Sequence, residues 1–132
     1  MIRLVGGKYI GEGRVEIYHA GIWGTVCDDK WIQDNNNAIV VCKSLGFASG
    51  TAIKSESGFG EGSGHIWLDD VDCTGMEFCL EDCQHAGWGQ TNCKHYEDIG
   101  VMCSGKYFNI RYFHYWKEHL KFDFTEATKC YC

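Results

Sequence analysis

Two pairs of adjacent carboxylates are the residues of this chain whose type and spacing point most directly to chemistry. Asp28 and Asp29 follow Cys27, and Asp69 and Asp70 form the second pair. Hard cations such as calcium prefer clustered oxygen ligands, usually carboxylates with some carbonyls and waters. Acidic pairs that stand alone more often only face solvent and offset lysines. A cation site is therefore predicted only where the fold brings separate acidic segments together.

Catalytic chemistry has little support in the sequence. The four histidines of residues 1–104, at positions 19, 65, 85 and 95, have no accompanying nucleophile elbow, zinc-helix motif or protease signature. Cys73, Cys79 and Cys83, with the Cys-x-Cys at the C-terminus, have a spacing that binds zinc in a reducing compartment. We therefore predict a non-enzymatic protein and keep zinc binding as an alternative.

Nine cysteines in 132 residues bear on the redox environment of the protein. This density is typical of small secreted domains that are stapled by disulfides, which favours an extracellular location. The sequence contains neither a signal peptide nor a run of about 18 apolar residues. We therefore interpret the chain as a fragment of a larger protein whose signal peptide lies upstream. A secreted parent and a membrane-anchored parent both fit this interpretation.

The net charge of −6 is unevenly distributed along the chain. Residues 1–104 carry 15 Asp and Glu against 7 Lys and Arg, whereas residues 105–132 carry 3 against 5. The acidic first part argues against nucleic acid as the main partner, because neutralising phosphates requires a basic face. It suits cations, or partners that arrive with their own cations.

The first acidic pair is positioned by a predicted β-hairpin. In residues 14–18, Val15 and Ile17 alternate with polar side chains, which is the pattern of a strand with one buried face. Residues 19–21 supply a turn, and residues 22–26 have the composition of the returning strand. The acidic pair then stands just beyond the hairpin.

One clear helix is predicted over residues 34–45. An acidic or amide side chain can cap its first turn, an apolar stripe that includes Cys42 faces the core, and Gly46 offers a left-handed stop. The remaining patterns predict strands at 3–5, 66–71 and 99–103, a short helical turn within 76–83, and loops at 55–64 and 88–92.

A domain boundary is expected near Ser104. Nine of the 19 aromatic residues fall in the last 28 positions, whereas 16 of the 17 glycines fall before them. Residues 105–132 have two competing interpretations. They are a gene-model artefact in which an intron is translated, or they are a genuine tail in which Cys130 or Cys132 bonds to Cys79.

Eight sequence blocks with a characteristic order and spacing occupy residues 2–104. They are RLVGG from Arg3, GRVE from Gly13, WGTVCDD from Trp23 with Trp31, VVCKSLG from Val40, FGEGSG from Phe59, IWLDDV from Ile66 before Cys73, WG at Trp88, and EDIGV from Glu97 before Cys103. In this combination they resemble the scavenger receptor cysteine-rich (SRCR) domain family.

The resemblance implies an α+β fold, a small disulfide-stapled domain in which a curved antiparallel sheet cradles one main α-helix. It also implies three disulfides, where the sequence alone leaves 15 pairings of six cysteines open; they are Cys27–Cys93, Cys42–Cys103 and Cys73–Cys83. The chain lacks the cysteine that some members carry before the GRVE block, and it has Phe47 in place of that cysteine's partner. It is therefore similar to the six-cysteine group A.

The resemblance further implies two cation sites near the first of these disulfides, with Ca²⁺ or Mg²⁺ as the cofactor. The positions that hold the first cation in the family are here Asp28, Asp29 and Glu97. The positions that hold the second are here Asp69 and Asn92, with Asp70 and Asp72 as additional ligands. Because the second site's Asn92 adjoins Cys93, the same disulfide is expected to anchor both sites.

A ligand-binding surface is implied on the predicted hairpin. A bacteria-binding motif of the family corresponds to residues 13–23, which gives as candidate contacts Gly13, Arg14, Val15, Glu16 and Trp23. Arg14 and Lys30 are bases close to the acidic residues and are candidates for binding anionic ligands. The competing interpretation is that the apolar residues of this stretch only maintain the fold. Three further tryptophans of residues 1–104 are interpreted, like Trp23, as core rather than as ligand platforms; they are Trp31, Trp67 and Trp88.

We predict an extracellular, non-enzymatic recognition module of the scavenger-receptor type. Its expected partners are polyanionic ligands or microbial surface glycans and proteins, bound through a divalent cation that lets a negative face hold a negative partner. One alternative is an accessory recognition domain of a larger secreted enzyme, such as a serine protease or a lysyl oxidase-like amine oxidase. Another is a structural adhesion domain, which predicts no cation dependence.

Overall fold

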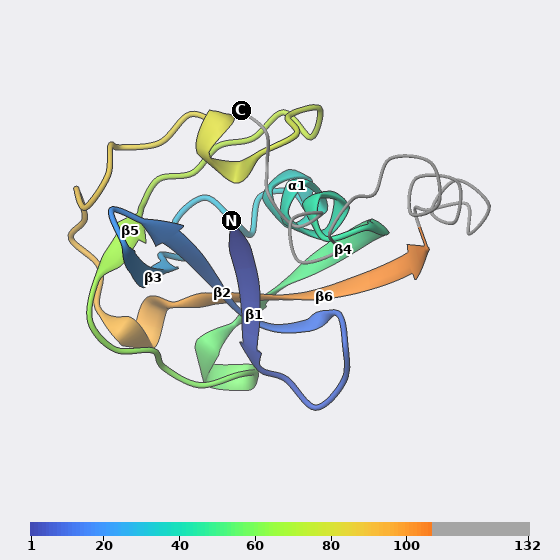
Figure 1. Cartoon of the computed structure of the whole chain (residues 1–132), viewed down its shortest axis with the longest axis horizontal. Helices are drawn as coiled ribbons and strands as arrows, with labels where there is room; N and C mark the ends of the chain where they lie inside the picture. Colours follow the sequence, from blue (N-terminus) through green and yellow to red (C-terminus); the bar gives the residue numbers. More distant parts are fainter. Residues whose placement is uncertain (107–132) are drawn as a thin grey trace.

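The computed structural model describes residues 1–106 (Figure 1). The described elements, in chain order, are strands β1 (Ile2–Gly6), β2 (Glu12–His19) and β3 (Ile22–Val26), helix α1 (Asn36–Ser44), strand β4 (Phe47–Lys54), the 3₁₀ turn η1 (Ser55–Ser57), strand β5 (Ile66–Leu68), the 3₁₀ turns η2 (Leu80–Asp82) and η3 (His95–Glu97), and strand β6 (Ile99–Lys106). The strands form one sheet in the order β4-β6-β2-β3-β5, and β1 pairs with β2.

The hairpin predicted around the first acidic pair is confirmed. Strands β2 and β3 are antiparallel, and His19 pairs with Ile22 across a two-residue turn. Ala20 and Gly21 both have positive φ, at 51° and 83°, which is the backbone that twists with the strands in a tight hairpin. On the inner face, Val15, Ile17 and Val26 are fully buried, as their alternation predicts.

Helix α1 packs across β4 and β6 on the core side of the sheet (Figure 1). Its buried stripe includes Ala38, Val41 and Cys42. Gly50 in β4 allows the helix to approach, because a Cβ at this position would lie only 2.2 Å from the Cys42 sulfur. Gly46 has a φ of 92° and ends the helix in the left-handed conformation, as expected.

Several predicted boundaries are wrong. The helix is shorter than 34–45, and the strand predicted at 66–71 ends at Leu68. Strand β4 was not predicted, because FASGTAIK has no regular alternation and contains a glycine. In the segment predicted as a helical turn, only residues 80–82 are helical, as a 3₁₀ turn.

The fold class and all three disulfides are confirmed. The structure is a small domain with one helix and a curled, mostly antiparallel sheet. The disulfides join the expected cysteines, Cys27–Cys93, Cys42–Cys103 and Cys73–Cys83. Within residues 1–106, no helix combines the length and the apolar character needed to cross a bilayer. The two interpretations of the C-terminal tail concern residues that lie outside the described part.

Candidate functional site

A parallel strand pair brings the two acidic pairs to one edge of the sheet. Strands β3 and β5 are neighbours and run in the same direction. Asp28 and Asp29 come shortly after β3, and Asp69 and Asp70 come directly after β5. Because the ends of parallel strands meet at the same edge, the two acidic pairs leave the sheet together.

Backbone hydrogen bonds fix a third acidic segment at this edge. The Cys27 amide donates to the Leu68 carbonyl at 2.9 Å, and the Asp28 amide donates to the Glu97 carbonyl at 2.8 Å. Cys27 also forms an isolated antiparallel bridge with Asp98. The segment that carries Glu97 is therefore held against the end of β3 by main-chain contacts as well as by the disulfide.

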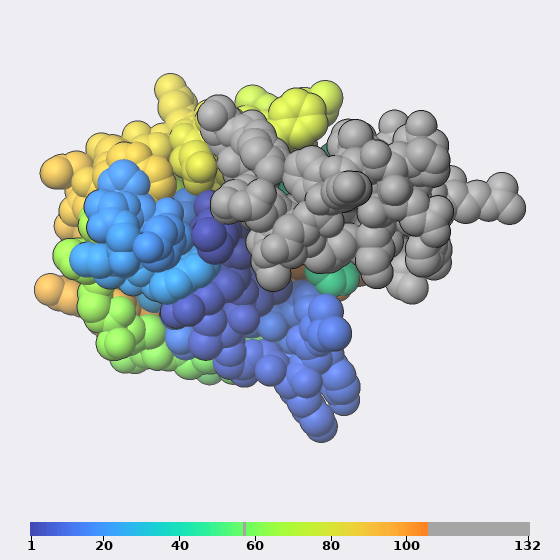
Figure 2. All heavy atoms as spheres, viewed as in Figure 1, coloured from blue at the N-terminus to red at the C-terminus, as the bar shows by residue number. Residues whose placement is uncertain are grey.

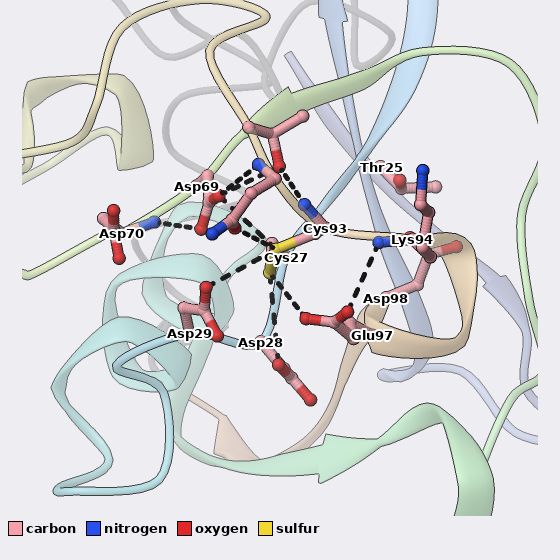
Figure 3. The surroundings of a disulfide bond; sticks show 12 residues. Thr25, Cys27, Asp28, Asp29, Asp69, Asp70, Cys93, Lys94, Glu97 and Asp98 are labelled. Carbon is pink, nitrogen blue, oxygen red and sulfur yellow. Dashed lines mark hydrogen bonds between the residues drawn. A yellow bond between two sulfur atoms is a disulfide. The ribbon is translucent and has the colours of Figure 1, made fainter.

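Four carboxylates surround the Cys27–Cys93 disulfide (Figure 3). Oxygens of Asp28 and Glu97 lie 4.0 and 3.9 Å from the Cys27 sulfur. Oxygens of Asp29 and Asp69 lie 3.5 and 3.4 Å from the Cys93 sulfur. Disulfide sulfurs carry no proton, so these contacts are not hydrogen bonds and do not neutralise the carboxylates. We call Asp28, Asp29, Asp69 and Glu97 the acidic ring.

Asp69 is the most deeply buried member of the acidic ring, with 2% of its surface exposed. Its carboxylate accepts hydrogen bonds from the Asp70 amide at 2.7 Å and the Thr91 hydroxyl at 2.9 Å, and a longer one of 3.4 Å from the Asn92 amide. All these donors are neutral. They orient the carboxylate toward the disulfide without supplying a positive charge.

The two predicted cation sites are contiguous in the structure. Candidate ligand oxygens of Asp29, Asp69 and Asp70 lie within 4.8 Å of one another, and those of Asp29 and Glu97 lie within the same distance. Asp29 belongs to both groups, whereas sequence reasoning placed it only in the first. Asp28 lies at the ring but in neither close group, and the Asn92 side-chain oxygen lies 3.7 Å from the Cys93 sulfur.

The electrostatics of the ring favour a bound positive charge. Desolvation by burial, followed by the charge of Asp69 and a hydrogen bond with it, raises the pKa of Asp29 to about 6. Burial also raises the pKa of Asp28, an effect that Lys54 opposes and Glu97 reinforces. The raised pKa values mean that the charged forms are disfavoured, first by burial and then by the neighbouring carboxylates. An all-oxygen donor set of this kind suits Ca²⁺ or Mg²⁺, since disulfide sulfurs are not thiolate ligands.

His95 and Asp98 form a hydrogen-bonded pair that sequence reasoning missed. Asp98 is 1% exposed, and one of its carboxylate oxygens lies 2.9 Å from Nδ1 of His95. The other ring nitrogen of His95 lies 3.0 Å from the Gly64 carbonyl oxygen. The Gly62 amide donates to Asp98 at 2.7 Å. The pair therefore holds the glycine-rich loop, residues 59–64, in place before β5. In the sequence, only the i,i+3 spacing of His95 and Asp98 could have indicated this pair.

The candidate ligand residues of the hairpin have different surroundings. Gly13 and Val15 are buried, which places both in the packing of the sheet. Glu16 is 7% exposed and lies between two arginines, with Arg3 at 2.6 Å and Arg14 at 2.9 Å. Arg14 also donates to carbonyls of the glycine-rich loop at 3.4 Å. Glu16 and Arg14 are thus engaged within the protein.

Trp23 is half-buried and Lys30 is exposed. The Arg3 guanidinium lies 4.2 Å from the centre of the Trp23 ring, and both residues line a hollow of about 360 Å³ next to the glycine-rich loop. Lys30 is exposed, two residues past Asp28, with a φ of 69°. Of the remaining tryptophans, Trp31 is fully buried, as predicted, and Trp67 and Trp88 are half-buried against the core.

Comparison with known proteins identifies relatives of this chain. Residues 5–104 match the scavenger receptor cysteine-rich domain. A "Scavenger receptor cysteine-rich domain superfamily protein" of Patiria pectinifera is 52% identical over 105 residues, which cover 80% of this chain and 9% of that protein. This chain therefore spans less than a tenth of that relative's length.

Solved structures are similar as well. The dimeric form of the SRCR domain of mouse MARCO is 50% identical, covers 77% of this chain and 93% of that chain, and superposes with a TM-score of 0.65. The third SRCR domain of murine neurotrypsin is 46% identical, covers 78% and 94%, and gives a TM-score of 0.70. Domains of this kind are extracellular, receptor-type modules that bind ligands. From the extent of the domain match and the level of these identities, the chain belongs to the scavenger receptor cysteine-rich family.

Proposed function

We propose that this domain binds polyanionic ligands or microbial surface glycans and proteins through a divalent cation held by the acidic ring. The observation that carries the proposal is the convergence of four carboxylates on one disulfide, with the pKa of Asp29 raised to about 6. In water such a cluster repels itself, so a divalent cation is the simplest group that stabilises it.

The proposed ligand set combines both predicted sites. Asp28, Asp29 and Glu97 would hold one Ca²⁺ or Mg²⁺, and Asp69, Asp70 and Asn92 would hold a second or complete the first. A bound cation would add positive charge to a domain that carries 15 acidic against 7 basic residues in its first 104 positions. An anionic ligand then completes the coordination of the cation.

Calorimetry on the full oxidised chain tests the proposal. We expect CaCl₂ to give saturable heat at pH 7.4 and to raise the thermal unfolding midpoint, and we expect Asp29→Asn to remove both effects. The matched control is Asp82→Asn, an exposed aspartate in η2 outside the ring. Absence of heat and of stabilisation at millimolar Ca²⁺ in the wild type would contradict the cation mechanism.

A polyanion assay separates this function from its alternatives. Binding of dextran sulfate to the immobilised domain is expected in Ca²⁺ and lost in EDTA. Equal binding in both buffers would instead favour direct contacts to accessible bases such as Arg3 and Lys30. No binding in either buffer would favour a structural adhesion domain.

The setting of the domain is a further part of the proposal. We place it in the six-cysteine group A, outside the cell, in a secreted or membrane-anchored scavenger receptor that acts in innate immunity and endocytosis. The name of one similar protein, neurotrypsin, keeps the accessory domain of a larger secreted enzyme as the second candidate. A catalytic domain in the full-length transcript would decide for the latter.

A further inference from the structure

The β1–β2 loop, residues 7–11, projects from the body of the domain and carries two large apolar side chains. Figure 1 shows the loop between the two strands, and Figure 2 shows it, in blue, standing out from the surface. Ile10 exposes 97% of its surface and Tyr9 exposes 67%. The Lys8 ammonium lies 5.5 Å from the centre of the Tyr9 ring, which adds a positive charge to the loop. Large apolar side chains exposed together are typical of a surface that binds another molecule.

Hydrogen bonds at the base of the loop fix its shape. Oε1 of Glu12 accepts bonds from the Lys8 and Tyr9 amides at 2.9 and 3.1 Å. The Cys103 amide of β6 donates to the Gly11 carbonyl at 2.7 Å, and Gly11 has a φ of 89°, which suits glycine. The loop is therefore preorganised, so little conformational entropy is lost when it binds.

An open hollow of about 520 Å³ lies beside the loop. Its apolar lining includes Leu4, Leu45 and Phe47, which are half-buried and pack against the core. The loop itself supplies the rest of the lining, with Lys8 and Glu12 as its charged residues. Among the described residues, no member of the acidic ring lines the hollow. One face of the domain therefore presents an apolar projection and an apolar depression next to each other.

A second copy of this chain fits both features at once. Under a two-fold axis the projection of each copy enters the hollow of the other, so both apolar surfaces are buried together. The charges are complementary as well, because the lining carries one base and one acid, Lys8 and Glu12. Both amide bonds to Glu12 end on Oε1, and its Oε2 can accept a bond from Lys8 of the second copy.

We propose that two copies of this domain associate through their β1–β2 loops, with the loop of each copy packed into the hollow of the other. A contact of this size buries less than roughly 1,200 Å² in total, which is typical of weak and transient complexes. Such a contact gains strength where several domains are held at one surface. The association does not depend on the proposed cation function.

Sedimentation equilibrium of the full oxidised chain in EDTA tests the association. Each copy has a net charge of −6, so about 150 mM NaCl is used to screen the repulsion between copies. We expect a reversible dimer to form as the concentration rises to about 1 mM. Ile10→Ser is expected to weaken the association at least tenfold, because each dimer loses two buried isoleucines.

The matched control for the apolar contact is Ile32→Ser, at a site 58% exposed and outside the loop. It is expected to leave the dimerisation constant unchanged. Thermal unfolding of the Ile10→Ser variant verifies that it keeps the wild-type fold, as its exposure predicts. A wild type that stays monomeric at about 1 mM overturns the proposal, and so does an association that Ile10→Ser does not weaken.

A charge reversal tests the orientation of the two copies. Lys8→Glu is expected to weaken the association further at low salt than at high salt, because it places two acids at each contact with Glu12. Lys94→Glu, at an exposed lysine of another segment, changes the net charge equally and is the matched control. Equal weakening by the two variants would mean that only the net charge acts, which overturns the two-fold arrangement.

Photo-cross-linking tests which surfaces meet. Tyr9→p-benzoylphenylalanine is mixed with isotope-labelled wild-type chain and irradiated, and the products are digested and weighed by mass spectrometry. We expect cross-links from position 9 to the labelled peptide that contains Leu45 and Phe47. Cross-links that lie only within one copy, or only to other segments of the labelled copy, overturn the proposal.

Discussion

Two buried carboxylates of this domain have opposite electrostatic surroundings. Glu16, on the hairpin, is 7% exposed and is paired with the guanidinium groups of Arg3 and Arg14. Asp69, at the acidic ring, is 2% exposed, receives hydrogen bonds from neutral donors and faces other carboxylates. Burial of a charge is costly unless it is paired. The charge of Glu16 is compensated by two arginines of the fold, whereas the groups that donate hydrogen bonds to Asp69 carry no positive charge.

The comparison distinguishes a structural charge from a functional one. Removing the paired carboxylate Glu16 is expected to destabilise the protein, because it leaves the 12% exposed Arg14 and the more exposed Arg3 without their partner. Removing a member of the acidic ring is expected to relieve repulsion between carboxylates and, under the proposed function, to abolish cation binding. Neutralising a carboxylate is therefore expected to lower the unfolding free energy at Glu16 and to raise it at the acidic ring.

Loss of the Cys27–Cys93 bond should have the largest effect, because this bond assembles the ring. The bond closes a 66-residue separation, so Cys27→Ser/Cys93→Ser is expected to lower the unfolding free energy by roughly 4 kcal/mol. Calcium heat should disappear as well. Urea unfolding and calorimetry measure the two effects. Removing Cys73–Cys83, with a separation of 10, is the control: it should cost roughly 3 kcal/mol and preserve the heat of Ca²⁺ binding.

Replacing the paired carboxylate should have the next largest effect. Glu16→Gln is expected to destabilise by about 2 kcal/mol in urea unfolding, less than for a fully buried pair because Arg3 is 47% exposed. Arg3→Gln, which keeps the Arg14 partner, should cost under about 1 kcal/mol. A loss for Glu16→Gln as small as that for Arg3→Gln would remove the distinction between the two regions.

Replacing a ring carboxylate should have the opposite sign. Asp29→Asn is expected to raise the unfolding free energy in EDTA by about 1 kcal/mol or less, because solvent partly screens the repulsion it removes. In millimolar Ca²⁺ the order should reverse, with the wild type the more stable. A variant that is destabilised in both buffers would show that Asp29 serves the fold.

The pH dependence of stability should sharpen this assignment. Asp29 has a folded pKa of about 6, above its unfolded value, so the native state binds the extra proton. In EDTA, its contribution to stability is therefore present at pH 4 and is lost as pH rises through 6. Ca²⁺ binding should strengthen over the same range. Thermal unfolding from pH 4 to 8, with Asp29→Asn as the reference, measures both trends.

His95 should give the smallest effect. Burial lowers the pKa of His95, but the hydrogen bonds to Asp98 and to the Gly64 carbonyl together raise it by more. The resulting pKa lies above the ordinary value for histidine. The stabilisation is therefore complete below the unfolded pKa and lost as pH rises through the folded one. His95→Gln should remove this dependence. An unchanged pH profile in the variant would assign it to another group.

Sequence patterns predicted the parts of this fold that local rules determine. Val15 and Ile17 alternate on a strand, and the helix that carries Cys42 ends at Gly46 as its residue types require. Strand β4 escaped prediction because its register comes from β6, which lies about 50 residues further along the chain. The disulfide pairs came from the family resemblance rather than from the residues alone.

The acidic ring was predictable only in part, for a topological reason. The family resemblance implied that Glu97 lies close to Asp28 and Asp29. Nothing local indicates that β3 and β5 are parallel neighbours, and this pairing brings Asp69 beside Asp29. The resemblance therefore implied two sites anchored by one disulfide, and in the structure their carboxylates form one continuous cluster.

The acidic ring also affects the reactivity of the bond that it surrounds. Disulfides are reduced by attack of a thiolate on a sulfur atom, and the thiolate carries a negative charge. Carboxylate oxygens within 4.0 Å of both sulfurs of Cys27–Cys93 repel that nucleophile. We therefore expect glutathione to reduce this disulfide slowly. A divalent cation in the ring would offset the negative charge and raise the reduction rate, which can be measured with and without Ca²⁺.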